Sequence, residues 1–174
     1  MRIHVVASDP GWKIQFEVEA EQIGRALGDI IVAAHHIGST AIPGIFAKPI
    51  IDILLEVDDI HRLDSRCSEL ESLGYESLGE FGIAGRRYFR KDSSSGRTHQ
   101  IHAFQTGNSE MERHLAFRDY MITHSDAARA YSDLKRELAK QHPEDMDAYM
   151  DGKDPFIKEH EARALAWRRR QAKK

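Results

Sequence analysis

The segment Ile50-Ile51-Asp52-Ile53-Leu54-Leu55-Glu56-Val57 constrains the fold more than any other part of the chain. Its β-branched and leucine-rich composition predicts a strand, and the side chains of a strand alternate between two faces. One face would carry Asp52 and Leu54, and the other would carry Ile51, Ile53, Leu55 and Val57. A carboxylate in the middle of such a strand is costly unless it meets a cation, a hydrogen-bond donor or a water-filled cleft. Asp52 therefore indicates either a structural cap for a nearby loop or a functional group, as a metal ligand or general base.

The rest of the pattern predicts a mixed α and β protein. We expect an extended arm over residues 1–9, a helix over 12–27 with Asp9 as its N-cap, and a strand over 30–37. These elements are followed by a loop over 40–47, a helix over 58–73, a short strand over 75–78 and a hairpin of 87–91 with 98–104. After residue 107 the pattern is helical, over 109–122, over 126–141 with Ser125 as the cap, and over 144–170. We therefore predict a single domain over 1–174, with the helices of 107–174 packed on a core of residues 1–106.

Composition excludes several classes of protein. The 174 residues suit one domain, and a net charge of −3 gives no general attraction to nucleic acid or an anionic membrane. Cys67 is the single cysteine and cannot form an internal disulfide, so we expect a cytoplasmic location. The apolar runs are too short to span a bilayer. The basic end over 168–174 indicates a solvated helix terminus or, alternatively, a contact surface.

A phosphate-compatible turn follows the first predicted strand. Gly38 would let a phosphate approach the backbone, while Ser39 and Thr40 offer hydroxyl and amide donors. The turn is not a P-loop, because Lys48 comes too late after Gly44. A Gly-Ser-Thr triplet is usually only a turn. Its pairing with Asp52 on the next strand, across a loop that carries a lysine, points to a cleft.

The same segment carries a resemblance to a known family. The hallmark of the GrpB family resembles the run from His36-Ile37-Gly38-Ser39-Thr40 to Ala47-Lys48-Pro49-Ile50-Ile51-Asp52. Further segments that match the family include Asp9-Pro10, Gly82-Ile83-Ala84-Gly85-Arg86-Arg87-Tyr88-Phe89 and Arg97-Thr98-His99-Gln100-Ile101-His102. The resemblance covers nearly the whole chain. It implies the nucleotidyltransferase superfold, an α+β class with a mixed sheet, flanking helices and a helical C-terminal third. Members of the family also occur fused to dephospho-CoA kinase.

The sequence departs from the metal site that this superfold implies. Active members usually carry two carboxylates two residues apart on one strand and a third on a neighbouring strand, which hold divalent ions such as Mg²⁺ or Mn²⁺. Asp52 matches the first carboxylate, but Leu54 occupies the second position. Glu56 would lie roughly 13 Å from Asp52 along the strand, too far to share an ion. The neighbouring strand offers only Gln100, His102 and His99 for the third position, so the two-metal mechanism is in doubt.

Histidines provide a different candidate chemistry. If the strands are neighbours, His36 and His102 can approach Asp52 and act as a base near neutral pH. Asp52 with His102 could also bind a single metal ion. The alternative is that these histidines are hydrogen-bonded polar residues of the cleft wall. A Ser39 nucleophile is disfavoured, because no nucleophile elbow or clear triad is present.

Cationic side chains complete the predicted site. Lys48, Arg87 and Lys135 are the candidates for binding phosphate, with Arg86, Arg118 and Lys153 as further cations in segments that match the family. The alternative is ordinary solvated surface. The expected partner is a nucleotide or another phosphorylated small molecule, whereas the scattered aromatic residues provide no stacking platform for nucleic acid. The oligomeric state stays open.

Two functional hypotheses follow. The first is a phosphate-handling enzyme, in the form of a divergent nucleotidyltransferase with an atypical metal site at Asp52. The second is a catalytically inactive module that binds a nucleotide or another anion and assists a partner protein or its folding. Leu54 favours the second hypothesis, whereas Asp52 inside an apolar strand favours the first.

Overall fold

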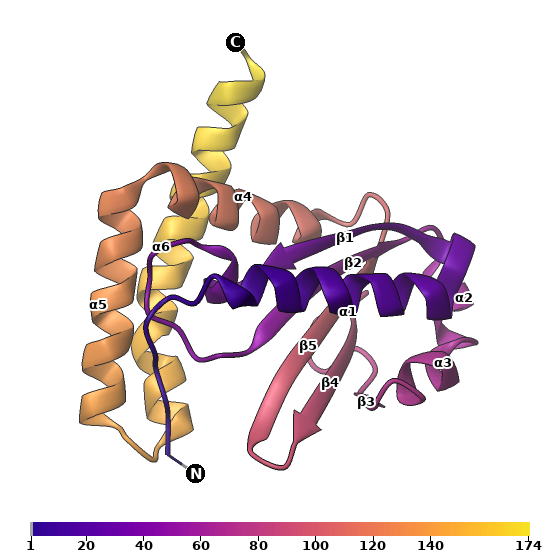
Figure 1. Cartoon of the computed structure of the whole chain (residues 1–174). Coiled ribbons are helices and arrows are strands. Elements are labelled where there is room, and N and C mark those ends of the chain that lie inside the picture. Colours follow the sequence, from indigo (N-terminus) through magenta and orange to yellow (C-terminus); the bar gives the residue numbers. More distant parts are fainter. Residues whose placement is uncertain (1) are drawn as a thin grey trace.

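The computed structural model describes residues 2–174 and contains one five-stranded sheet (Figure 1). The strand order is β1-β2-β5-β4-β3, and only the central pair β2 and β5 is parallel. The strands are β1 Ile31–Ile37, β2 Ile51–Val57, β3 Tyr75–Ser77, β4 Arg87–Ser93 and β5 Gly96–Gln105. The apolar β2 therefore lies inside the sheet, between β1 and β5. The predicted α+β class with a mixed sheet is confirmed.

Six α-helices accompany the sheet in residues 2–174. They are α1 Gly11–Leu27, α2 Ile60–Asp64, α3 Cys67–Glu71, α4 Ser109–Thr123, α5 Ser125–Gln141 and α6 Met146–Ala172. Short 3₁₀ turns, η1 Gly28–Ile30 and η2 Ser39–Ala41, flank β1. Pro10, and not the predicted Asp9, occupies the N-cap position of α1, while the Asp9 carboxylate just before it accepts a hydrogen bond from the Gly11 amide at 2.8 Å. Pro155 lies inside α6, where its ring removes one backbone donor without ending the helix.

Two further predicted details of the helices are wrong. The helix expected over 58–73 is divided into α2 and α3, because Arg66 leaves the helical conformation and donates to the Ala26 carbonyl at 3.0 Å. The N-cap of α2 is Asp59, whose carboxylate accepts a hydrogen bond from the amide of His61 at 2.8 Å. Ser125 is the first residue of α5 rather than its cap, since His124 occupies the cap position without a side-chain hydrogen bond. Local periodicity therefore located these helices but not their ends.

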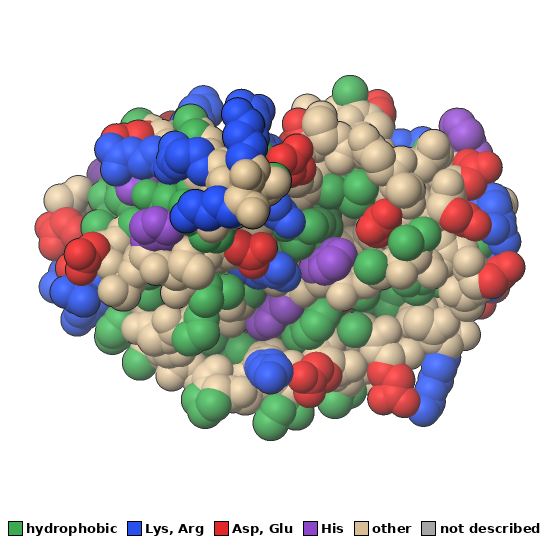
Figure 2. Space-filling model, turned by 90° about the horizontal axis from the view of Figure 1, so that it is seen from above, with side chains coloured by type: hydrophobic (Ala, Val, Ile, Leu, Met, Phe, Trp, Pro, Cys, Tyr) green, Lys and Arg blue, Asp and Glu red, His purple; other side chains and the backbone are tan. Residues whose placement is uncertain are grey.

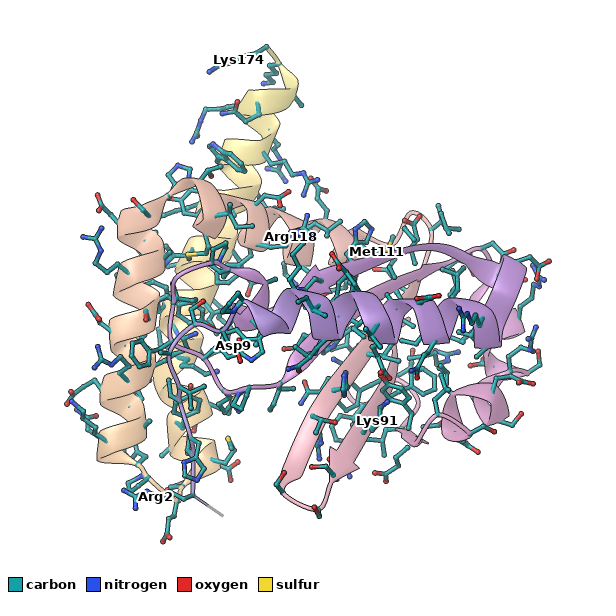
Figure 3. The ribbon with its side chains drawn as sticks, viewed as in Figure 1. Arg2, Asp9, Lys91, Met111, Arg118 and Lys174 are labelled. Carbon is teal, nitrogen blue, oxygen red and sulfur yellow. The ribbon has the colours of Figure 1, made fainter. Side chains whose placement is uncertain are left out.

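The two faces of the sheet are covered by different helices. Ile51, Ile53, Leu55 and Val57 are fully buried in the main core with α1, α2 and α3. Leu54 faces the other way and packs with Ile37 and Phe104 against Met111 of α4. Of the residues labelled in Figure 3, Met111 on α4 lies on the face of Leu54, and Lys91 on β4 lies on the face covered by α1. Asp52 shares the face of Leu54, so it lies on the side of the sheet that meets the C-terminal helices.

The C-terminal helices close against the end of the sheet where β1 finishes and β2 begins. Ile42 and Ile45, from the loop between these strands, pack with Met121 of α4 and Tyr131 of α5. α5 and α6 approach closely at Gly152, where an added Cβ would lie 2.5 Å from Leu138. A larger residue at Gly152 would force these helices apart. The close approach places residues of both helices around one space beside Asp52.

The end of α6 projects beyond the rest of the fold (Figure 1). Lys and Arg side chains gather on this projection when the molecule is viewed from that end (Figure 2). Arg169 and Arg170 in its last turn are exposed. Over residues 2–174, no helix combines the length and apolar character that crossing a membrane requires.

Candidate functional site: a lysine-lined cleft beside Asp52

A cavity of about 210 Å³ lies where β1, β2 and the C-terminal helices meet. Ile37 at the end of β1 is paired in register with Asp52 near the start of β2, so the turn after β1 lies beside the carboxylate. The polar side chains and glycine that line the cavity are Gly38, Ser39, Thr40, Lys48, Asp52, Gln100, Tyr131, Lys135, Tyr149 and Lys153. Five of the residues predicted for the site, together with Asp52, therefore share one cavity.

Gly38 and Asp52 are in direct contact. Gly38 has a φ of +75°, and an added Cβ would lie 2.5 Å from Oδ2 of Asp52. Both the left-handed backbone and the close approach require glycine at this position. The Asp52 side chain keeps 24% of its exposure, so the carboxylate opens into the cavity instead of being enclosed by apolar residues. The structure thus supports a cleft at Asp52 over a buried structural cap.

The contact with Arg86 assigns the tautomer of His102. Nε2 of His102 lies 3.2 Å from Oδ1 of Asp52, and Nδ1 lies 3.3 Å from Nη1 of Arg86. A guanidinium only donates hydrogen bonds, so Nδ1 must accept one and the ring proton must lie on Nε2. His102 therefore donates to Asp52 and orients the carboxylate. In this arrangement Nε2 has no free lone pair with which to take a proton or to bind a metal.

Arg86 is held for this role by backbone carbonyls. It is 7% exposed, and it donates through Nε to Glu80 at 3.2 Å and through Nη2 to Phe81 at 2.8 Å. Burial is the main cause that lowers the pKa of its guanidinium. An arginine retains its proton even so, because its reference pKa is so high. The sequence indicated Arg86 only as a candidate cation and gave no sign of its contact with His102.

His36 lies on the opposite face of the sheet from Asp52. Its partner in register is Ile53, and its ring stacks on Phe16 of α1 with centroids 4.9 Å apart. Nε2 lies 2.9 Å from the hydroxyl of Thr40. Burial lowers the pKa of His36 to about 4, so the ring is neutral near pH 7. The structure does not bring His36 to Asp52, because strand alternation turns it toward α1.

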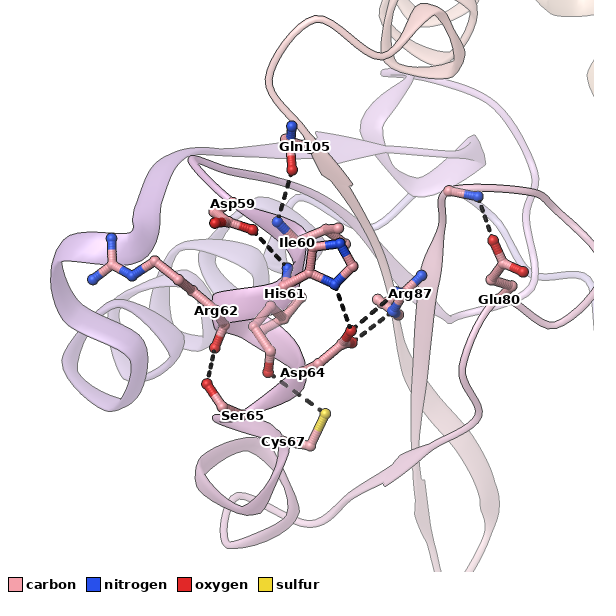
Figure 4. Close-up of polar contacts among 12 residues, drawn as sticks. Asp59, Ile60, His61, Arg62, Asp64, Ser65, Cys67, Glu80, Arg87 and Gln105 are labelled. Carbon is pink, nitrogen blue, oxygen red and sulfur yellow. Dashed lines mark hydrogen bonds and ion pairs between the residues drawn. The ribbon is translucent and has the colours of Figure 1, made fainter.

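Arg87 also lies outside the cavity. Its Nε donates to Oδ1 of Asp64 at 2.6 Å, and its Nη2 donates to Oδ2 at 3.0 Å (Figure 4). These hydrogen bonds are the main cause that raises the pKa of Arg87. Arg86 and Arg87 are adjacent, and Arg86 is the one of the pair that reaches the face of Asp52. Arg87 is thereby removed from the set of phosphate-binding candidates in the cleft.

Three lysines gather in the cavity beside two tyrosine rings. Lys135 is 1% exposed, and its Nζ is buried without a hydrogen-bond partner among residues 2–174, 4.3 Å from the centre of the Tyr131 ring. Lys153 is 7% exposed and lies 4.7 Å from the ring of Tyr149, whose buried hydroxyl also has no partner in this part of the chain. Lys48 approaches the same ring at 5.4 Å. Cation–π contacts offset part of the cost of burying these charges.

The electrostatics of the lysines show a deficit of negative charge. Burial, followed by repulsion from Lys153 and Lys48, lowers the pKa of Lys135 to about 7. Burial and repulsion from Lys48 lower the pKa of Lys153 to about 8, although Asp52 opposes this. Of the residues that the structure describes, Asp52 is the sole acidic one that lines the cavity. The negative charge of an anion placed among these lysines would offset both the cost of their desolvation and their mutual repulsion.

The carboxylates needed for a two-ion centre do not assemble. Leu54 is fully buried between Ile37 and Phe104, and the residue opposite Asp52 on β5 is Gln100. Glu56 instead accepts a hydrogen bond from Thr106 at 2.8 Å. Among residues 2–174, no group of three or more His, Cys, Asp and Glu side chains could hold a metal ion. The donors present do not fit a protein-built metal centre.

The site predicted from the sequence does not use one signal, which is the regular spacing between tyrosines and lysines. Tyr131 and Lys135 are four residues apart on α5, and Tyr149 and Lys153 are four residues apart on α6. Residues at this spacing lie on one face of a helix. Two Tyr-x-x-x-Lys pairs on neighbouring helices therefore indicate a shared aromatic and cationic wall.

Comparisons with known proteins place the chain in a family. The sequence profile of the family described as GrpB protein matches residues 2–163. UPF0157 protein YqkA of Bacillus subtilis is 42% identical over 168 residues, which are 97% of this chain and 49% of YqkA. A crystal structure of conserved protein GrpB from Enterococcus faecalis superposes with a TM-score of 0.90 at 44% identity, over 94% of this chain and 98% of that one. The chain belongs to the GrpB family, and it spans about half the length of YqkA.

Two more distant similarities bear on the predicted fold and fusion. A dephospho-CoA kinase of Mycolicibacterium paratuberculosis is 25% identical over 190 residues, which are 95% of this chain and 46% of that protein. A structure of the Cid1 poly(U) polymerase with bound MgGTP superposes with a TM-score of 0.52 at 16% identity, over 78% of this chain and 44% of the polymerase. The second comparison shows the nucleotidyltransferase-like fold alone.

Proposed function

We propose that this protein binds a nucleotide or a related phosphorylated small molecule by its phosphate groups, in the cleft between Asp52 and the three lysines. The observation that carries the proposal is the buried ammonium of Lys135, which has no partner among residues 2–174 and lies among further positive charges. A buried charge without a partner is expensive, and a bound anion would supply the missing partner. Phosphate groups offer the dense negative charge that three lysines require.

The turn after β1 supports the same proposal. Gly38 keeps the backbone open beside the cavity, and the hydroxyl of Ser39 lies 3.4 Å from that of Tyr131 on the cavity wall. A glycine-containing turn with a serine is suited to phosphate oxygens. The superposed Cid1 polymerase has MgGTP bound. Fold and charge therefore favour the same ligand class.

Nucleotidyl transfer is the second candidate function. The observation in its favour is that Asp52 opens into the cavity and is oriented by His102. One carboxylate with the phosphates of the ligand suffices to contact a single Mg²⁺ or Mn²⁺ ion, which usually keeps several waters. The absence of a second and a third carboxylate beside Asp52, among residues 2–174, favours binding over transfer. His102 would act here as the residue that positions Asp52.

Calorimetric titration with ATP, with and without Mg²⁺, tests the proposal. We expect saturable binding by the wild type and a loss of at least about tenfold in affinity for Lys135→Met. Lys140→Met is the matched control, because Lys140 is an exposed lysine on the same helix. Its affinity should equal that of the wild type. Absence of binding in both conditions, or equal binding by Lys135→Met, contradicts the proposal.

Asp52→Asn separates the two candidate functions. If transfer is the function, Mg²⁺ should strengthen ATP binding to the wild type, and this gain should disappear in Asp52→Asn. If the protein only binds, Asp52→Asn should retain its ATP affinity or bind more tightly, because a negative charge has left the cleft. Release of pyrophosphate in the presence of Mg²⁺ or Mn²⁺, lost in Asp52→Asn, would establish transfer.

A further inference from the structure

The size of the cleft limits what it can enclose. Its volume is about 210 Å³, whereas sites that enclose a drug-sized ligand occupy roughly 300–1,000 Å³. This space suits a short phosphate chain and is too small to enclose a nucleoside as well.

The chemistry of the wall suits phosphate and not a base. Among the described residues that line the cleft, the buried donors without a partner are the Nζ of Lys135 and the hydroxyl of Tyr149. Lys48 and Lys153 add two further ammonium groups. Gln100 is the single side-chain amide in the described lining, and it is paired in register with Asp52 on the sheet. Reading the edge of a base requires several placed donors and acceptors. The wall provides donors in excess and few acceptors.

The aromatic rings of the wall are already covered. Tyr131 stacks on Phe156 with centroids 5.4 Å apart, and Lys135 approaches the same ring at 4.3 Å. Phe117 meets Tyr131 edge-to-face at 5.8 Å. Lys48 and Lys153 both lie near the ring of Tyr149. The aromatic residues here serve as cation partners, so they do not form a platform on which a base could stack.

We infer that the cleft recognises an oligophosphate chain itself, so that it binds inorganic tripolyphosphate and all four nucleoside triphosphates alike. The inference rests on the proposed function and names its ligand class. The nucleoside of a bound nucleotide would extend out of the cleft into solvent, where it contributes little affinity. The number of phosphates, and not the identity of the base, then determines binding.

Competition titrations with the full chain test the inference. The probes are tripolyphosphate, ATP, GTP, CTP, UTP, AMP and adenosine, each without Mg²⁺ and with saturating Mg²⁺. We expect tripolyphosphate and the four triphosphates to agree within about threefold, AMP to bind at least about tenfold more weakly, and adenosine not to bind. Tripolyphosphate should displace ATP completely.

Several outcomes would overturn the inference. If one triphosphate binds more than about tenfold tighter than the others, the base is read. If triphosphates bind where tripolyphosphate does not, the nucleoside contributes to recognition. The proposed function would survive either result. Failure of every phosphate probe would overturn both. The inference is also overturned if tripolyphosphate binding is unchanged in Lys135→Met but lost in the double variant Arg169→Gln/Arg170→Gln. That result would place the contact on the basic end of α6.

Discussion

Two clusters of buried charge lie on opposite faces of the sheet and differ in how they are satisfied. On the face of α1, Glu19 is 6% exposed and forms an ion pair with Lys91, accepts a hydrogen bond from Tyr75 at 2.7 Å, and lies 3.8 Å from His99. In the cleft, Lys135 is buried as deeply and has no carboxylate or hydrogen-bond partner within residues 2–174. One cluster is satisfied by partners within the chain, whereas the other lacks a negative partner among the described residues.

This difference in charge compensation is the one that we expect between a structural site, here the Glu19 cluster, and a binding site, here the Lys135 cluster. Burial opposes ionisation of Glu19, but the hydrogen bonds from Lys91 and Tyr75 outweigh it and lower the pKa of the carboxyl. In the cleft, burial and like-charge repulsion act in the same direction on Lys135. We therefore expect the first cluster to stabilise the fold and the second to lower the free energy of unfolding. A destabilising cluster of this kind is what the proposed anion site requires.

Removal of Glu19 should have the largest effect on stability. Glu19→Ala leaves Lys91 and the hydroxyl of Tyr75 without their partner at the junction of α1 with the sheet. We expect a loss of about 3 kcal/mol in the free energy of unfolding, measured by urea denaturation. Glu21→Ala is the control, because Glu21 lies on α1 and is exposed. A loss below about 0.5 kcal/mol for Glu19→Ala would show that the paired cluster is not structural.

Removal of Lys135 should act in the opposite direction. Lys135→Met replaces a buried unpaired ammonium with an apolar chain of similar length, and we expect it to raise the free energy of unfolding by about 1–3 kcal/mol at pH 7. The same variant should lose ATP binding. Lys140→Met, with its exposed side chain, should change stability by less than about 0.5 kcal/mol. Destabilisation by Lys135→Met would remove the contrast between the two clusters.

Gly38 tests the backbone that carries Asp52 into the cleft. Gly38→Ala combines a φ of +75° with a Cβ that would lie 2.5 Å from the Asp52 carboxylate. We expect a loss of about 1–2 kcal/mol in the free energy of unfolding, together with weaker binding of ATP. Gly24→Ala is the matched control, because Gly24 lies in α1 with nothing within 4 Å of an added Cβ. It should stabilise the protein by about 0.5–1 kcal/mol. Equal effects of the two substitutions would contradict the close contact.

The pH dependence of stability should have opposite signs for the two clusters. The pKa of Lys135 is about 7 in the folded protein and ~10.4 in the unfolded chain. Between these two pH values, Lys135 binds more protons in the unfolded chain than in the folded protein. The stabilising effect of Lys135→Met should therefore be complete below pH 7 and vanish by about pH 10, at no more than ~1.4 kcal/mol per pH unit. The contribution of Glu19 is present above its unfolded pKa of ~4.3 and is lost as the pH falls. Urea denaturation at several pH values would measure both, and a constant difference between wild type and Lys135→Met would contradict the account.

The sequence predicted the sheet and the location of the cleft because both depend on local pattern. The alternation of Asp52 with isoleucines defined a strand with one polar position, and Gly38-Ser39 marked the turn beside it. Neighbouring strands and three C-terminal helices followed from periodicity and caps. The GrpB resemblance supplied the superfold, and the comparisons confirm it.

The remaining features depend on tertiary contacts. Nothing local decides that Arg86 meets His102 while Arg87 pairs with Asp64, and His36 turns toward α1 because of the strand's exact register. The break between α2 and α3 depends on a carbonyl of α1 that Arg66 reaches across the chain. The burial of Lys135 requires α5 and α6 to close at Gly152. Lysines are solvated by default, so this burial is not expected from the sequence.

The most direct test is an NMR titration of Lys135 in protein labelled at the lysine Cε carbons, with its signal assigned by comparison with Lys135→Met. In the free protein we expect Lys135 to titrate with a pKa of about 7. Saturating ATP should raise this pKa by more than about one unit, because the phosphates supply the missing negative charge. A free pKa near the usual lysine value, or the same pKa with and without ATP, would contradict the claim that the lysine cluster is built to receive an anion.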